Sequence, residues 1–198
     1  MKVEKIRLEG EFVRLEPLEI GHLEKLCEVG LDESLWLWTA NIIKTSADMK
    51  GYIKTALDEF RRGVSLPFVT IEKSSDKIVG STRFGNIDAK NRKMEIGWTW
   101  INPRWQRTFV NTEAKLLMLT HAFETWNYVR VELKTDVLNE KSQKAMLRLG
   151  AQKEGVLRRH LITDAGRIRD TVYFSILDSE WQTVKANLEE KLRNGGKK

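Results

Sequence analysis

The sequence predicts an α/β (α+β) fold built on a mixed, mostly antiparallel sheet. Two pairs of apolar-rich runs, 67–72 with 77–87 and 154–162 with 169–177, are each joined by a short polar turn, which is typical of hairpins. Residues 46–62 carry apolar side chains at three-and-four spacing, which indicates an amphipathic helix. Hairpins and helices that alternate along one chain favour a sheet covered by helices.

Each element is supported by its own local pattern. Thr45 can cap the helix at 46–62, with Asp48 completing a variant of the capping box. Asn139 can cap a helix that ends at Gly150, and Ser179 with Gln182 marks the start of the last helix. In chain order we expect strands at 6–17 with a bend at Gly10, a helix at 19–31, a helix at 46–62, strands at 67–72, 77–87 and 94–101, a buried helix to 126, a strand at 129–136, a helix at 139–150, strands at 154–162 and 169–177, and a helix from 179.

Size and composition suit one domain over residues 1–198, with a core at about 10–185 and a basic C-terminal tail at about 194–198. The single cysteine, Cys27, permits no internal disulfide, and no apolar run approaches the ~18 residues that would span a membrane. We therefore expect a cytoplasmic protein. The net charge of +6 arises from 34 basic and 28 acidic residues scattered along the chain, so nucleic-acid binding is not expected to be the main function.

The stretch from Met94 to Trp126 organises the chain. It begins as a strand with Met94, Ile96, Trp98 and Trp100 on one face, and Asn102-Pro103 ends that strand. A polar loop follows, and Asn111 and Thr112 are the expected start of the buried helix. Backbone N–H groups and the positive end of the helix dipole meet there, and Arg107 adds a charge, so the loop is a candidate anion site.

This loop resembles the acetyl-CoA pyrophosphate loop of the GNAT superfamily of N-acetyltransferases, whose pattern is Gln/Arg-x-x-Gly-x-Gly/Ala. Gln106 matches the first position, whereas Phe109 and Asn111 stand where glycines are usual. The element order also resembles that family, from about residue 10 to 185. Stretches similar to the RimJ/RimL branch, named for ribosomal-protein N-terminal acetyltransferases, are EIGWTW, NTEAKLLML, HAF, RVELKTD, N-x-x-S, LGA, EGVLRRH and RDTVYFSIL. The resemblance implies a GNAT-like acyl-CoA N-acyltransferase fold with helices on both faces of the sheet.

The resemblance also implies which residues would bind acetyl-CoA, the expected cosubstrate. The free edge of the splayed strand would bind pantetheine through Trp100, Ile101 and Asn102. Asn139 would contact the pantetheine arm, while Lys141, Lys144 and Arg148 either meet the adenosine phosphates or form a solvated helix face. The pyrophosphate would lie on Gln106, Arg107, Thr108, Phe109, Val110, Asn111 and Thr112.

The proton-transfer groups are less sharply indicated. Glu95 matches the glutamate that serves as base in some GNAT enzymes, and Glu154 is its rival, although either could form a structural salt bridge. Met146 stands where many members of the family have a proton-donating tyrosine, so the resemblance makes Ser142 the nearest hydroxyl for the leaving sulfur. Ser142 could equally cap the helix, and the thiolate could leave without a dedicated acid. Trp36, Trp38 and Arg83 are the candidates for the acceptor side, and the two tryptophans could equally fill the core.

The leading hypothesis is an acetyl-CoA-dependent enzyme that acetylates a primary amine by direct transfer in a ternary complex. The acceptor would be a protein N-terminal α-amine or a small-molecule amine, and neither a metal nor a membrane is expected. The departures at Phe109, Asn111 and Met146 also fit a non-catalytic CoA-binding module, and the basic charge fits, less well, a nucleic-acid-binding protein. The sequence leaves the oligomeric state open, a homodimer included.

Overall fold

A computed structural model describes residues 3–195, so residues 196–198 of the basic tail lie outside the described part of the chain. Within it, eight strands form one sheet in the order β1-β2-β3-β4-β5-β6-β8-β7. Only β5 and β6 are parallel neighbours, as expected for a mixed, mostly antiparallel sheet. The strands are β1 Leu8–Glu9, β2 Val13–Pro17, β3 Leu66–Glu72, β4 Lys77–Asp88, β5 Lys93–Ile101, β6 Arg130–Asp136, β7 Gln152–Ile162 and β8 Ile168–Leu177.

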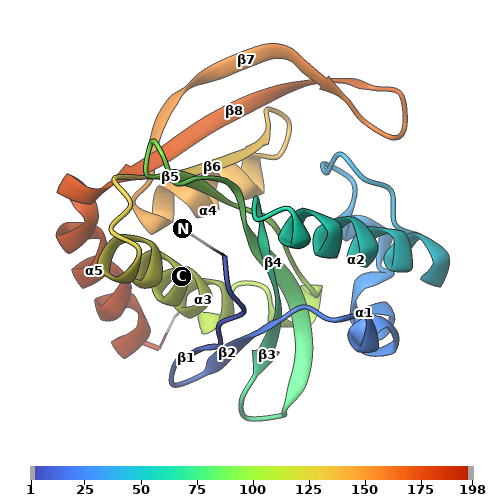
Figure 1. Ribbon diagram of the computed structural model, residues 1–198, viewed down its shortest axis with the longest axis horizontal. Helices are drawn as coiled ribbons and strands as arrows, with labels where there is room; N and C mark the ends of the chain where they lie inside the picture. The colour runs from blue at the N-terminus through green and yellow to red at the C-terminus, as the bar shows by residue number, and fades with distance from the viewer. Residues whose placement is uncertain (1–2, 196–198) are drawn as a thin grey trace.

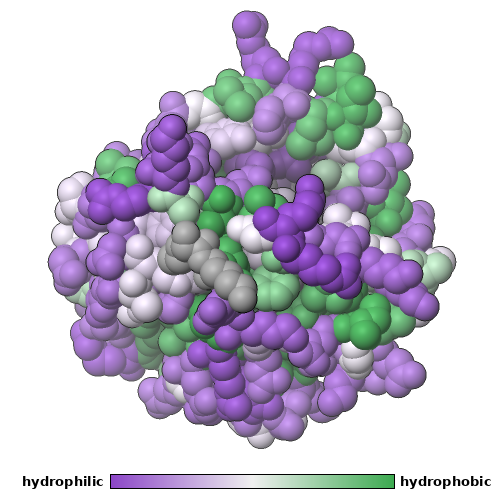
Figure 2. Space-filling model, in the orientation of Figure 1, coloured by the Kyte–Doolittle hydropathy of each residue, from purple (hydrophilic) through white to green (hydrophobic). Residues whose placement is uncertain are grey.

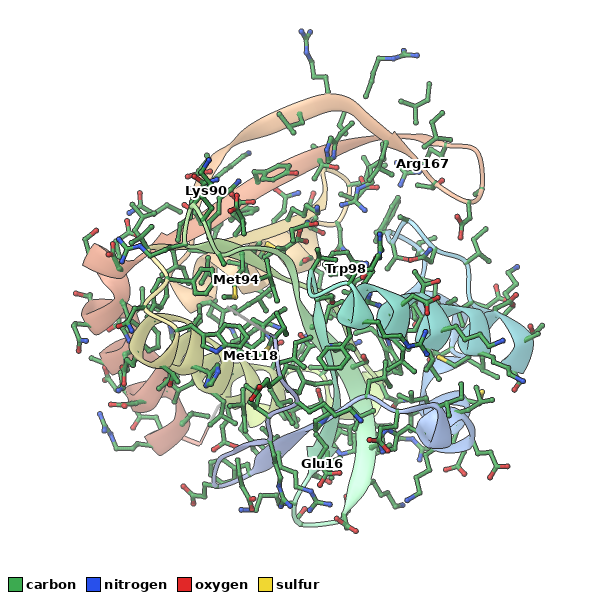
Figure 3. All side chains as sticks on the ribbon, in the orientation of Figure 1. Glu16, Lys90, Met94, Trp98, Met118 and Arg167 are labelled. Atoms are coloured by element: carbon green, nitrogen blue, oxygen red, sulfur yellow. The ribbon has the colours of Figure 1, made fainter. Side chains whose placement is uncertain are left out.

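Helices cover both faces of this sheet (Figure 1). One core lies between the sheet and helices α3, α4 and α5, and a second lies beneath α1 and α2. Figure 3 shows Met94 and Met118 on the α3 side and Trp98 beside α2. The helices are α1 Leu23–Gly30, α2 Ser46–Arg61, α3 Phe109–Thr120, α4 Glu140–Leu149 and α5 Asp178–Arg193, with 3₁₀ turns at Ile20–His22, Glu33–Leu35 and Pro103–Trp105 and a π-helical turn at His121–Thr125.

The parallel strands β5 and β6 separate partway along their length. Their pairing runs only from Lys93 opposite Arg130 to Glu95 opposite Glu132. Beyond that point β5 stays paired with β4 as far as Ile101, whereas β6 continues beside β8 to Asp136. We call the region between residues 96–101 of β5 and residues 133–136 of β6 the splay. Because backbone groups at an unpaired strand edge need partners, the splay is a natural place for a ligand.

A β-bulge in β5 changes the expected alternation of its side chains. The register against β4 shifts between the Arg83–Gly97 and Ser81–Trp100 pairs, and Trp98 has a positive φ of 48°. A bulge adds one residue to one strand and so reverses the faces beyond it. Met94 and Ile96 therefore pack with α3, but Trp98 and Trp100 pack under α1 and α2, so the prediction of one shared face was wrong.

The capping motifs were predicted with mixed success. Thr45 caps α2, and its hydroxyl accepts the Asp48 N–H at 3.2 Å in a complete capping box, as expected. Asn139 accepts the Ser142 N–H at 3.0 Å at the start of α4, which ends at a left-handed Gly150. The last helix was predicted, but its start at Ser179 with Gln182 was wrong: α5 begins at Asp178, because the Glu180 carboxylate accepts the Leu177 N–H at 2.9 Å.

A buried carboxylate ties α3 to the N-terminal strands. Glu113 is 4% exposed and accepts the backbone N–H groups of Glu11, Phe12 and Val13 at 2.8, 2.8 and 2.6 Å. A Cβ on Gly10 would lie 2.5 Å from this carboxylate, so the bend needs glycine. Three charge-assisted hydrogen bonds hold β2 against the helix that begins at the splay.

The face of the molecule shown in Figure 2 is mostly polar, with apolar side chains gathered near the turn of the β7–β8 hairpin. Large exposed apolar side chains come from this hairpin and from the segment that leads into α2. Among residues 3–195, no helix is long and apolar enough to cross a membrane. The exposed apolar side chains of these two segments are Leu37, Ile42, Val156, Leu157, Ile162 and Ile168.

Candidate active site

Backbone groups of β5 face the splay, and strand alternation decides which ones. The Asn102 N–H donates to Val79 O at 2.9 Å, and the Trp100 carbonyl lies against Gly80, so both residues face β4. Alternation then turns Thr99 and Ile101 towards the splay. Of the three residues expected to bind pantetheine, Ile101 alone presents its backbone there, and the bulge turns the backbone of Thr99, which was not among them, to the same side.

The loop after β5 is held by its own side chains. Gln106 donates through Nε2 to Ile101 O at 2.7 Å, and its Oε1 accepts a hydrogen bond from Lys141 of α4. The Thr108 hydroxyl donates to Trp105 O at 2.7 Å and accepts the Val110 N–H at 3.3 Å. Thr108 is therefore the N-cap, and α3 begins at Phe109. The predicted start at Asn111 and Thr112 was wrong, because the Thr108 hydroxyl caps the helix about one turn earlier.

The two departures from the glycine pattern do not distort this loop. Its left-handed residue is Arg107, with φ of 61°, so neither Phe109 nor Asn111 needs a positive φ. The Phe109 ring packs on Phe12 with centroids 4.4 Å apart, which directs the side chain into the protein. The first turn of α3 thus keeps its dipole, and its backbone N–H groups other than that of Val110, available to an anion, with exposed Arg107 beside them. Thr112 is buried one turn further along.

Helix α4 forms the opposite side of the loop. Lys141 reaches Gln106, whereas Lys144 is exposed and pairs with Glu140 at 3.2 Å. The Asn139 side chain is used in capping, and Ser142 lies half-buried in the same turn. Met146 packs partly buried against the core, so α4 offers no acidic proton donor at that position.

Glu95 is a buried carboxylate at the point where β5 and β6 separate. It is 3% exposed, and Oε2 accepts from Asn86 Nδ2 at 2.7 Å and pairs with Lys134 Nζ at 2.8 Å. Both of these contacts are to Oε2. Oε1 lies over Gly97, where a Cβ would be 2.5 Å away. The bulge and its glycine therefore leave one carboxylate oxygen facing the α2 side of the splay.

Glu154 lies on β7, which β6 and β8 separate from β5. Arg130 binds both of its oxygens, and the Ser175 hydroxyl donates to Oε1 at 2.8 Å. The Arg130 guanidinium lowers the pKa of Glu154 to about 2. Strands β6 and β8 lie between β7 and β5, so the structure places Glu154 away from Glu95.

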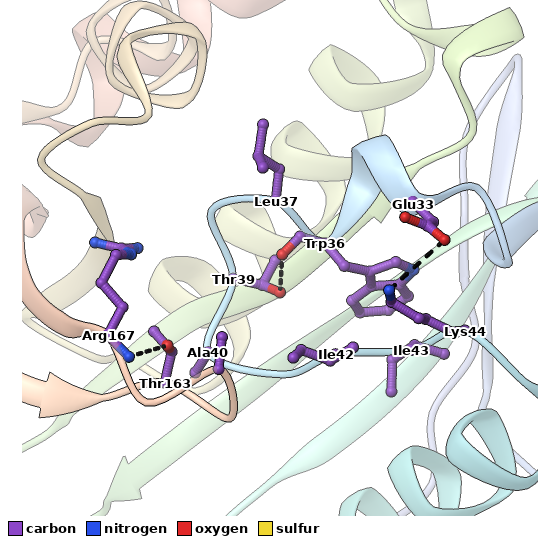
Figure 4. A pocket seen from close by; sticks show the side chains of 11 residues that line it. Glu33, Trp36, Leu37, Thr39, Ala40, Ile42, Ile43, Lys44, Thr163 and Arg167 are labelled. Atoms are coloured by element: carbon purple, nitrogen blue, oxygen red, sulfur yellow. Dashed lines mark hydrogen bonds and ion pairs between the residues drawn. The ribbon is translucent and has the colours of Figure 1, made fainter.

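A pocket of about 210 Å³ lies beside the splay (Figure 4). Trp36 lines it and packs on Trp100 of β5 at 5.6 Å between ring centroids, while Arg167 lines it and pairs with Asp136 at the end of β6. The pocket thus adjoins both separated strands. Its lining residues are Glu33, Trp36, Leu37, Thr39, Ala40, Ile42, Ile43, Lys44, Thr163, Ala165 and Arg167.

The three candidates for the acceptor side have different surroundings. Trp36 both lines the pocket and fills the core, with its Nε1 donating to Gly30 O at 2.7 Å. Trp38 packs under Arg167, with the guanidinium carbon 5.7 Å from the ring centroid, outside the pocket lining. Arg83 is 2% exposed, pairs with Glu59 at 2.9 Å and lies between the Tyr52 and Trp98 rings. Arg83 therefore supports Trp98 from within the core.

One titratable group near the splay was missed. Lys115 of α3 is 4% exposed, and its ammonium donates to Thr99 Oγ1 at 2.7 Å and to Thr82 Oγ1 at 3.0 Å. Burial lowers the pKa of Lys115 to about 7. The sequence signal was a pair of charged residues, Glu113 and Lys115, within a helix that is otherwise apolar around most of its circumference.

Comparisons with known proteins agree with this geometry. A model of the acetyltransferase (GNAT) domain matches residues 13–152. The chain is 31% identical over 183 residues, 89% of its length and 97% of the relative's, to "Putative ribosomal N-acetyltransferase YdaF" of Bacillus subtilis. It is 21% identical to the ribosomal-protein-serine acetyltransferase of Escherichia coli, covering 86% of this chain and 96% of that one.

Solved structures share the fold. A GCN5-related N-acetyltransferase from Brucella melitensis is 32% identical, with a TM-score of 0.89 over 97% of this chain and 87% of that one. Mycobacterium smegmatis RimJ, solved in complex with CoA-disulfide, has a TM-score of 0.77 at 22% identity and covers 96% of this chain and 94% of its own. The sheet that opens between β5 and β6, the loop before α3 and the matched family model lead to one conclusion. This chain belongs to the GNAT family and is an N-acetyltransferase.

Proposed function

We propose that this enzyme transfers the acetyl group of acetyl-CoA to the N-terminal α-amine of a peptide or protein. GNAT enzymes use acyl-CoA, and the loop from Gln106 to Thr108 with the first turn of α3 suits its pyrophosphate. Arg107 supplies a charge, and Lys141 secures the loop from α4. The free edge of β5 at Thr99 and Ile101 would bind the pantetheine arm.

The acceptor class rests on the pocket beside the splay. Its volume of about 210 Å³ is below the ~300–1,000 Å³ of typical small-molecule sites, so it suits the end of a chain better than a whole ligand. Apolar side chains from two segments surround it, with Leu37 63% exposed and Ile162 72% exposed. Such a rim suits the residues that follow a chain end. The names of two relatives, a ribosomal N-acetyltransferase and a ribosomal-protein-serine acetyltransferase, support the same class.

We assign the base to Glu95. The amine must lose its proton as nitrogen attacks the thioester carbon, and a carboxylate or a water that it binds can accept it. Oε1 of Glu95 lies at the bulge, on the same face as the pocket. The Arg130 pair makes Glu154 a weak proton acceptor at neutral pH, and β6 and β8 lie between Glu154 and β5. Attack and departure of the thiolate then take place in one ternary complex.

A binding measurement tests the cosubstrate assignment. Acetyl-CoA at about 100 times its Kd should add about 2.7 kcal/mol to the free energy of unfolding, which raises the melting temperature by roughly 5–10 °C. ATP at the same concentration should give a smaller shift. Arg107→Ala should reduce the acetyl-CoA shift without lowering the melting temperature of the free protein. Equal shifts with ATP, or no shift with millimolar acetyl-CoA, would contradict the assignment.

A further inference from the structure

Lys115 is a buried cation without an anionic partner. Among the described residues its ammonium contacts only two hydroxyls, Thr82 and Thr99, and no ion pair. The nearby acid on the same helix, Glu113, is fully used by three backbone N–H groups of the N-terminal strands. Burying an ammonium with neutral partners costs free energy, and such groups cluster at functional sites.

One arrangement of the hydrogen bonds around Lys115 leaves the Thr99 proton weakly bound. Lys115 donates to the oxygens of both threonines, and Thr82 Oγ1 lies 2.8 Å from Thr99 Oγ1 and 3.7 Å from Met118 Sδ. When Thr82 donates to Met118, the Thr99 hydroxyl can donate to Thr82. When Thr82 donates to Thr99, the acceptor left for the Thr99 hydroxyl is Gly97 O at 3.4 Å, which is long for a hydrogen bond. In this second arrangement Thr99 has a polarised proton to offer to a ligand.

The position of Thr99 on β5 indicates where that ligand would lie. Thr99 is exposed, on the part of β5 that β6 no longer covers, and its side chain is on the α3 face of the sheet. Lys115 is the seventh residue of α3, about 9 Å along the axis from the first turn, where the pyrophosphate would bind. The pair thus faces the splay beyond the phosphates, towards the reactive end of the pantetheine arm.

We propose that the Thr99 hydroxyl donates a hydrogen bond to the sulfur that leaves acetyl-CoA, and that Lys115 holds and polarises that hydroxyl. This rests on the proposed function, because it takes the splay as the acetyl-CoA site. In the transfer a C–N bond forms, the C–S bond breaks and its electron pair goes to sulfur. The amine proton passes to the Glu95 side. Thr99 and Lys115 keep their protons, and the thiolate takes its proton from solvent after release.

The pKa of the CoA thiol in the binary complex tests this without any acceptor. Ultraviolet absorbance of the thiolate, followed over the pH range of about 6 to 10, gives this pKa. Wild-type protein should lower it relative to free CoA. Lys115→Met and Thr99→Val should each reduce the thiolate fraction about tenfold at a pH between the two values, whereas Thr99→Ser should keep the wild-type value.

Two controls separate this proposal from the function on which it rests. Desulfo-CoA, which lacks the sulfur, should bind the wild type, Lys115→Met and Thr99→Val with affinities within about threefold, which also reports that each variant is folded. Ser142→Ala should leave the thiol pKa unchanged. Desulfo-CoA binding with an unshifted thiol pKa in the wild type, or a shift that survives Lys115→Met or is lost in Ser142→Ala, would overturn the role of Thr99. Failure of the wild type to bind desulfo-CoA would overturn both proposals.

Discussion

At the scale of single residues, the site depends on charged side chains whose environments differ. Within residues 3–195, Lys115 has hydroxyl partners alone, Glu95 has one cationic partner on one of its oxygens, and Arg130 binds both oxygens of Glu154. Because of these environments, Lys115 can stabilise a charge on a ligand, Glu95 can accept a proton, and Glu154 is fixed in a structural ion pair.

The Lys115→Met variant should be more stable than the wild type near pH 7. The folded wild type has a Lys115 pKa of about 7 against 10.5 for the ordinary side chain, so between these values the unfolded state binds more protons. Wild-type stability should therefore rise with pH across this window, by up to about 1.4 kcal/mol per pH unit from this group. Methionine removes that dependence.

Urea unfolding between pH about 7 and about 9.5 measures this effect. The advantage of Lys115→Met should shrink steadily as pH rises. Lys54→Met, at an exposed position of α2, is the matched control and should show a flat difference. If the wild type is more stable than Lys115→Met at pH 7, or if the difference in their free energies of unfolding does not depend on pH, then burial of the Lys115 ammonium does not destabilise the fold.

Glu95→Gln and Glu154→Gln should differ in their effect on turnover. Glu95→Gln should lower kcat by about 10²–10⁴, because the amine loses its proton acceptor, while acetyl-CoA affinity stays within about threefold. Glu154→Gln should retain most of its turnover. Steady-state kinetics with one acceptor peptide distinguishes the two, and the reverse ranking would make Glu154 the base.

Glu154 should instead affect how the free energy of unfolding changes at acid pH. Its folded pKa of about 2 lies below its ordinary value of 4.5, so the pair contributes stability above pH 4.5 that is lost as pH falls towards 2. Because the carboxylate is 40% exposed, solvent screening keeps the contribution near 1 kcal/mol or less. In chemical unfolding, Glu154→Gln should be less stable than the wild type at neutral pH and equal to it near pH 2. A difference that does not change with pH would argue against the pair.

Sequence patterns predicted part of the residue-scale picture. The polar loop, the helix dipole and Arg107 indicated an anion site from the sequence alone. The one-residue bulge at Trp98 could not be predicted from them. The alternation of apolar residues in the sequence continues through Trp98, and only the pairing with β4 shows that the register shifts there. That bulge turns the backbones of Trp100 and Asn102, which were expected to bind pantetheine, towards β4, and it brings Thr99 to face Lys115.

At the scale of elements, helix α3 connects the site to the rest of the fold. Its first turn would bind the anion, Glu113 holds the N-terminal strands and Lys115 faces the splay. The strands and amphipathic helices were predictable because their periodicity extends over many residues. The starts of α3 and α5 were not, since Thr108 and Glu180 each compete with other nearby capping side chains, and tertiary packing selects one.

Removal of the Glu113 charge should loosen this connection. Glu113→Gln leaves three backbone N–H groups sharing one amide oxygen, which should cost about 2–3 kcal/mol and lower the melting temperature by roughly 5–10 °C. Glu180→Gln is the matched control, because Glu180 accepts one backbone N–H and should cost less. Thermal unfolding of both variants checks the prediction, and equal losses would contradict it.

At the scale of the whole molecule, the helices on the two faces of the sheet contribute different parts of the candidate site. The α3–α4 side carries the loop that we propose for the cosubstrate, and the segment before α2 approaches the β7–β8 hairpin (Figure 1). The pocket that we propose for the acceptor is lined by both segments. The Asp164 N–H donates to Ala40 O at 2.9 Å, and Trp38 packs under Arg167, so these distant segments are joined. The fold and element order were predictable from the sequence, but this contact was not, because it is made by two irregular segments.

Acetyl transfer to two matched peptides tests the central claim most directly. One peptide has a free N-terminal amine and a blocked lysine side chain, and the other has the same sequence with a blocked N-terminus and a free lysine. Both are incubated with the enzyme and acetyl-CoA, and mass spectrometry locates the added acetyl group. We expect acetylation of the first peptide at its α-amine and no product from the second. Acetylation of the lysine alone, or of a small-molecule amine but neither peptide, would contradict the proposed acceptor.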